Sequence, residues 1–179
     1  QWTTHFTGVD VDRHGVSGFR RRSSESTDSV DGKGITPEVE QLINLSDISL
    51  LTYPELLGKA GLSSGLINPM PLWPPVKLSN GYCVSGMLTP RESDNWYYPD
   101  DIGLVLEETG YRIDIRYRDR PYGFVDDDLL NEVKLDVLRE DMLDVLQTRI
   151  DATKRLLTDR PTDFTYVLLK SIDVIQHVY

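Results

Sequence analysis

The last sixteen residues, 164–179, constrain the fold of this chain most. Residues 164–169 form an almost uninterrupted apolar run, which predicts a strand buried on both faces of a parallel sheet. Asp173 and His177 follow at once, four residues apart. Open α/β sheets keep their functional groups outside the carboxyl ends of the strands. The pattern therefore predicts an α/β fold with a site at the end of this strand.

Asp173 and His177 are candidate metal ligands. A carboxylate and a neutral imidazole suit zinc, and a spacing of four lets both side chains face one point if the chain turns helically there. The alternative is that Asp173 caps the next helix while His177 is packed or solvated. Taken by themselves, the local residues favour this second interpretation, because such a pair often arises by chance.

Length and composition indicate one sizeable domain. The chain has 179 residues and no apolar run long enough to span a bilayer, so we expect a soluble protein without membrane contact. No basic segment followed by an apolar one opens the chain, which favours a cytoplasmic location. The first residue is Gln1 and not Met, and we expect the chain to be a fragment of a longer protein.

The charge of the chain is strongly acidic. A net charge of −10 argues against a nucleic-acid polymer as partner, since phosphate neutralisation needs a basic face. The chain has twenty Asp to nine Glu, and thirteen Arg to six Lys. This balance suggests a halophilic protein, although an ordinary acidic surface is the alternative. Unfolding at low salt and refolding at molar salt would support halophily; indifference to salt would contradict it.

Several other residue types have two interpretations. Cys83 is the single cysteine, so no internal disulfide is possible, and we expect it to be a small buried hydrophobe. His14 could approach a site, but a histidine that holds its turn by a hydrogen bond is favoured. Four aromatic residues could line a substrate pocket, although packing is the more common role for such residues: they are Trp73, Trp96, Tyr97 and Tyr98.

The rest of the chain alternates between helix and strand patterns. Residues 1–8 fit either element, and residues 20–46 are polar enough for an exposed loop or insertion. Helices are predicted at 52–61, 99–109 and 126–158, and strands at 65–68, 82–88 and 111–117. The long helix could be one helix or two in tandem. Residues 126–128 are all Asp, which suits a helix start, with a calcium or magnesium site as the alternative.

Several segments resemble the type I phosphodiesterase and nucleotide pyrophosphatase family of the alkaline phosphatase superfamily, in particular its prokaryotic members. The similar segments are Trp2-Thr-Thr-His-Phe-Thr-Gly8 with Asp12-Arg-His-Gly15, Tyr53-Pro-Glu-Leu-Leu, Gly65-Leu-Ile-Asn-Pro69, Trp73-Pro-Pro75, Val84-Ser-Gly-Met-Leu-Thr-Pro90, and Asp173 with His177. The middle segments are the most specific. The likeness covers nearly the whole chain except residues 20–46 and the details of the long helix.

The resemblance implies an alkaline-phosphatase-like α/β/α sandwich with a mainly parallel central sheet, incomplete in this chain. It also implies a phosphohydrolase that uses two divalent metal ions to act on a small phosphoester. The ions are usually zinc and sometimes manganese. Asp173 and His177 would be ligands of one ion. The family's Thr or Ser nucleophile would stand just before Gln1, with further ligands upstream and beyond Tyr179, so we expect the chain alone to be inactive.

One departure from the family's pattern and two alternatives keep other functions open. The family's pyrophosphatases place an Asn shortly after the His-Gly pair, where this chain has Val16-Ser-Gly-Phe19, so the resemblance does not imply nucleotide specificity. A sulfatase or a phosphoglycerate mutase of the same superfamily is one alternative, although Cys83 lies in the wrong segment for a sulfatase nucleophile. The other is a non-catalytic remnant or binding domain. Neither the dinucleotide nor the Walker glycine pattern is present.

Overall fold

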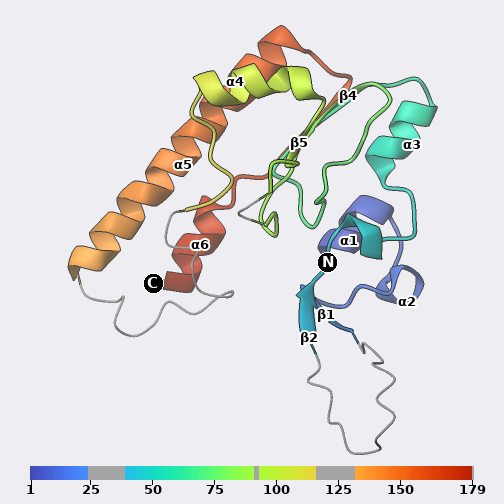
Figure 1. Cartoon of the computed structure of the whole chain (residues 1–179), viewed down its shortest axis with the longest axis horizontal. Helices are drawn as coiled ribbons and strands as arrows, with labels where there is room; N and C mark the ends of the chain where they lie inside the picture. The colour runs from blue at the N-terminus through green and yellow to red at the C-terminus, as the bar shows by residue number, and fades with distance from the viewer. Residues whose placement is uncertain (24–38, 91–92, 116–131, 179) are drawn as a thin grey trace, which may run out of the picture.

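The computed structural model describes residues 1–23, 39–90, 93–115 and 132–178 (Figure 1). Its centre is a four-stranded sheet with the order β5-β4-β3-β6. Strand β3 (Ser64–Ile67) is parallel both to β4 (Gly81–Val84) and to β6 (Phe164–Val167). Only the short β5 (Tyr97–Tyr98) runs antiparallel to its neighbour β4. The predicted α/β class with a mainly parallel sheet is confirmed at this level.

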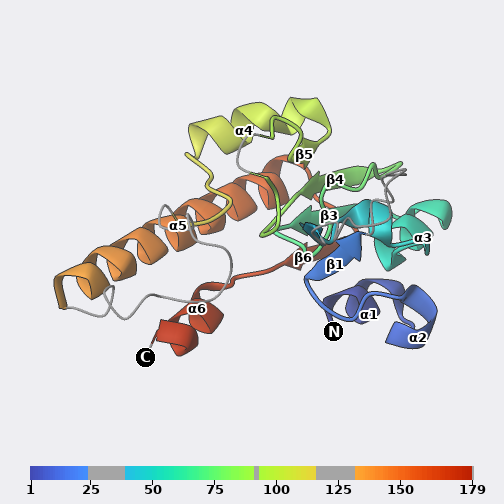
Figure 2. The same cartoon turned by 60° about the horizontal axis from the view of Figure 1, so that its bottom comes forward.

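Helices cover both faces of the sheet (Figures 1 and 2). On one face, Leu66 and Cys83 pack into a core with Phe6 of α1 (Trp2–Thr7). On the other face, Ile67 and Tyr82 pack against α4 (Gly103–Glu108) and α5 (Glu132–Asp159). Successive strand residues therefore enter opposite cores, which explains why the β3 and β4 patterns read as apolar throughout.

Helix α3 (Tyr53–Lys59) follows from local signals that the sequence contains. The backbone N–H and the hydroxyl of Thr52 both donate to the Glu55 carboxylate, and Pro54 lies in the first turn. Gly61 follows the helix with φ +80°, the left-handed conformation that favours glycine. The predicted helix at 52–61 is confirmed. The one predicted at 99–109 is also confirmed, as the 3₁₀ turn η2 (Asp100–Ile102) followed by α4.

Helix α5 settles the question of one helix or two, since it is continuous over 28 residues. Leu156 is fully buried in the core against the sheet, whereas the next residue, Leu157, is exposed. The helix therefore packs on the sheet with one face only. The predicted acidic helix start at 126–128 lies outside the described residues. None of the described helices is long and apolar enough to cross a membrane.

Two predicted strands differ from the structure. Residues 111–115, the described part of the strand predicted at 111–117, form no strand. Their polar groups turn to α5 instead, because Arg112 forms ion pairs with Asp141 and Asp144 while Arg149 donates to the Ile113 carbonyl. The strand predicted at 82–88 ends earlier, at Val84.

The strand predicted at 164–169 is confirmed as β6, and its two faces contact the two cores, but the prediction of complete burial is wrong. Strand β6 ends at Val167, and all four of its residues are half-buried. It lies at the edge of the described sheet, with β3 on one side and no described strand on the other. A strand with one neighbour is covered less completely than a central strand, even when its sequence is equally apolar.

The amino-terminal part consists of short helices and strands. Its first helix packs on the face of the sheet that Leu66 and Cys83 line. Residues 1–8, which fitted either element, form α1 and end at Gly8 with φ +69°. After the one-turn α2 (Val11–His14), β1 (Arg20–Ser23) pairs antiparallel with β2 (Val39–Leu42). The exposed loop predicted at 20–46 therefore begins and ends differently from the prediction, since its flanks are paired strands. The segment closes with the 3₁₀ turn η1 (Leu45–Asp47).

Candidate functional site

The carboxyl ends of β3, β4 and β6 meet at one edge of the sheet, because the three strands are parallel. Asn68 follows β3 at this edge, and its N–H donates to the Val84 carbonyl at the end of β4. On the other side, the N–H of Leu168 donates to the Ile67 carbonyl. This is the position where open α/β sheets place their functional groups.

Helix α6 (Ser171–Val178) begins at this edge, shortly after β6 ends at Val167. Asp173 lies in its first turn and is exposed, and position 177 follows one turn later. The helical turn that the metal interpretation requires is therefore present. Asp173 lies within the first turn and not at the position before the helix, since Ser171 already belongs to it. The side chain of His177 lies outside the described part, and the described residues contain no group of three or more potential metal ligands.

Asn68 connects the end of β3 to the segment that leads into α6. Its side chain is fully buried, its backbone has φ +61°, and its Nδ2 donates to the Leu168 carbonyl over 2.7 Å. Gly86 leaves room for it, because a Cβ at Gly86 would overlap Asn68 Oδ1. The amide of Asn68 therefore fixes where β6 ends and α6 begins. The sequence showed Asn68 only as the end of a strand pattern.

Two cationic side chains lie beside the start of α6. Arg149 of α5 is almost fully buried, and its Nε has no hydrogen-bond partner within the described segments. Together with Lys170 and Ser171 it lines a space of about 10 Å³, the size of one water molecule. Asp114 lines the same space, so the local charge is mixed.

His14 holds the turn after α2, as the favoured interpretation predicted. The ring is buried, and its Nδ1 accepts from the Val16 N–H over 3.1 Å. Nε2 therefore carries the proton and donates to Thr4 Oγ1 over 2.9 Å. Both ring nitrogens are used inside the protein, which leaves neither for a substrate or a metal ion.

Replacing His14 with Ala is expected to lower the free energy of unfolding by about 1–2 kcal/mol, because it leaves buried groups of Thr4 and Val16 without partners. Urea unfolding followed by circular dichroism measures this. His5→Ala is the matched control, since His5 is exposed and makes only ring contacts. Equal losses in the two variants would contradict a special role for the His14 hydrogen bonds.

Cys83 is a buried hydrophobe, as predicted. Its side chain is fully buried, and burial raises the pKa of the thiol to about 12. A thiol that is neutral and inaccessible at neutral pH is a poor nucleophile. The structure thus disfavours Cys83 as a catalytic group.

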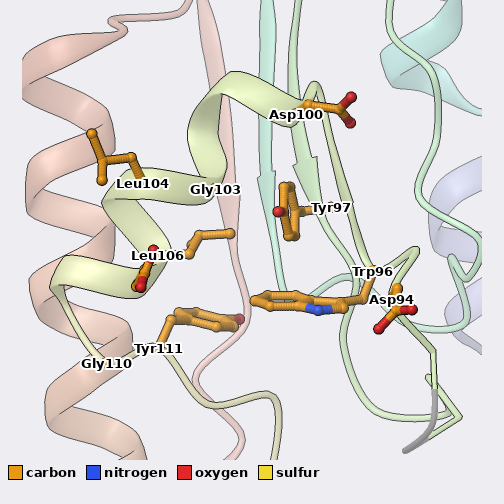
Figure 3. A pocket seen from close by; sticks show the side chains of 10 residues that line it. Asp94, Trp96, Tyr97, Asp100, Gly103, Leu104, Leu106, Gly110 and Tyr111 are labelled. Atoms are coloured by element: carbon orange, nitrogen blue, oxygen red, sulfur yellow. The ribbon is translucent and has the colours of Figure 1, made fainter.

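The four aromatic residues divide between two roles. Trp73 is structural, because its indole N–H donates to the Asn95 carbonyl over 3.0 Å. Trp96 and Tyr97, by contrast, line an open cavity of about 670 Å³ next to α4 (Figure 3), while Tyr98 is not among its lining residues. The same two rings pack against the core on that side of the sheet.

Comparison of the chain with protein-family models, curated proteins and solved structures gives no match.

Proposed function

We propose that this chain is part of a metal-dependent phosphohydrolase of the phosphodiesterase or nucleotide pyrophosphatase type, with an alkaline-phosphatase-like fold. One observation carries the proposal. Helix α6 starts at the carboxyl edge of a parallel sheet and carries Asp173 and His177 one turn apart. This agrees with the position and the order that the resemblance implies for one metal-binding pair.

The donor set suits the metal ions that the proposal requires. A carboxylate and an imidazole are suitable ligands for zinc and, as the second choice of ion, for manganese. When bound, two such ions would activate a Thr or Ser hydroxyl and stabilise negative charge on the phosphate oxygens. Asp173 and His177 would hold one of the ions, while the nucleophile and the remaining ligands would come from sequence outside this chain.

Other residues of the chain would support this pair. Asn68 fixes the segment before α6 through the Leu168 carbonyl, so it limits how far α6 can shift relative to β3. Arg149 and Lys170 would contribute positive charge near an anionic substrate, partly offset by Asp114. Neither group is proposed to take part in proton transfer.

The proposal requires a longer protein that contains this chain, and it is tested on that protein. We expect hydrolysis of bis(p-nitrophenyl) phosphate, loss of activity after chelation, and recovery when zinc or manganese is added back. p-Nitrophenyl sulfate serves as the comparison substrate and should react far more slowly. Faster turnover of the sulfate would favour the sulfatase alternative. Absence of turnover together with absence of titratable metal binding would favour a non-catalytic domain.

A further inference from the structure

The cavity beside α4 has an aromatic wall (Figure 3). Trp96 and Tyr97 meet edge to face with ring centroids 4.8 Å apart, and Trp96 stacks on Tyr111 at 5.8 Å. The side chains come from the segment around β5, from α4 and from Tyr111 just after it. With a volume of about 670 Å³, the cavity is within the usual range for small-molecule sites.

The charged side chains at this cavity are all acidic. Asp94, Asp100 and Glu107 are among its ten lining residues, and no Lys, Arg or His is. All three are exposed, and none forms an ion pair with the described part of the chain.

The carboxylates next to them in sequence are neutralised. Asp101 pairs with Arg160, and Glu108 pairs with Arg155 over 3.5 Å. The described part of the chain thus neutralises the two carboxylates that do not line the cavity and leaves those that line it uncompensated.

Tyr111 adds a buried hydroxyl to this aromatic wall. Its ring is more than nine-tenths buried, and Figure 3 shows its hydroxyl directed toward Trp96. Burial raises the pKa of Tyr111 to about 12, against the opposing effect of Arg149, so the hydroxyl stays protonated at neutral pH. The hydroxyl has no hydrogen-bond partner of good geometry among the described residues, although Arg149 lies close enough to lower its pKa.

We propose that this cavity binds a small organic cation that carries a trialkylammonium group. A cation over the faces of Trp and Tyr is attracted by the ring quadrupoles, most strongly when it is weakly hydrated. The three carboxylates add a negative potential, which attracts a cation and repels anions such as phosphate. The site is independent of the proposed phosphohydrolase activity.

The test is a titration of the full chain with choline, measured by isothermal titration calorimetry. The comparison ligand is 3,3-dimethylbutan-1-ol, which has the shape of choline without its charge. We expect choline to bind at least tenfold more tightly. Glu107→Gln should weaken choline binding about two- to fivefold, the range of a partly exposed charge interaction. The matched control Glu108→Gln should leave it unchanged, and Asp100→Asn and Asp101→Asn form a second matched pair.

Four results would overturn the proposal. Equal binding of choline and its neutral analogue would show an apolar cavity without charge selection. Equal effects of Glu107→Gln and Glu108→Gln would show attraction by the net charge of the protein. Competition by magnesium or calcium at low concentration would show an inorganic cation site. The absence of choline binding up to millimolar concentration would also exclude the site. The carboxylates are exposed, so we expect the variants to fold, which circular dichroism would check.

Discussion

Replacing Asp173 with Asn, or His177 with Ala, is expected to lower kcat/KM for phosphodiester hydrolysis by about a hundredfold or more in the longer protein. Loss of a side chain that merely supports a metal ligand already costs about 10–100-fold, so loss of a ligand should cost at least as much. Zinc content per protein should fall in parallel. Raising the free zinc or manganese concentration should restore part of the activity, because the remaining ligands still bind the ion, only more weakly.

The control uses the same residue type as Asp173 at an exposed position away from α6. Asp159→Asn, at the last residue of α5, should leave metal content and activity unchanged. If the α6 variants kept full metal content and full activity, Asp173 and His177 would not be ligands. A loss of activity at unchanged metal content would point to a structural effect of α6 instead.

The parts of the fold that the sequence predicts are those governed by local residues. Helix α3 is one example, because Thr52, Pro54 and Gly61 specify its two ends within ten residues of each other. The inner strands β3 and β4 are another example. Both are covered on two faces, and a continuous apolar run is the pattern that predicts such a strand.

The parts that could not be predicted depend on partners far away in the chain. Residues 111–115 alternate like a strand, but Arg112 pairs with Asp141 and Asp144, about thirty residues later. A short-range pattern contains no information on such a contact. The burial of β6 failed for a related reason, because burial depends on which strands lie beside it and not on its own composition.

The same reasoning applies to the two candidate sites. The role of Asn68 depends on Leu168, one hundred residues away, and on the space that Gly86 leaves. Within the described residues, the uncompensated charge of the cavity beside α4 depends on Arg155 and Arg160, which pair with Glu108 and Asp101 from about fifty to sixty positions later in the chain. The sequence shows five carboxylates near α4 and cannot say which of them pair with the arginines of the described part.

Replacing Gly81 with Ala is expected to lower the free energy of unfolding by about 3 kcal/mol or more, the largest effect on stability that we predict. Two costs add here. Gly81 has φ +133°, where a side chain is strained by roughly 1–3 kcal/mol. A Cβ would also overlap the Ser64 carbonyl oxygen and lie 2.8 Å from its carbonyl carbon, and relieving such overpacking costs about 1–3 kcal/mol.

Two other glycines separate these costs. Gly61 has φ +80° but open space around it, so Gly61→Ala should cost only the strain, about 1 kcal/mol. Gly18 lacks both the positive φ and the close neighbour, so Gly18→Ala should lie within about 0.5 kcal/mol of the parent protein. Urea unfolding of the three variants measures the series. If Gly81→Ala were no worse than Gly61→Ala, the backbone of Ser64 could not lie against Gly81 as the β3–β4 register requires. The carboxyl edge that carries Asn68 would then be arranged differently, because the Asn68 N–H donates to the last residue of β4 in that same register.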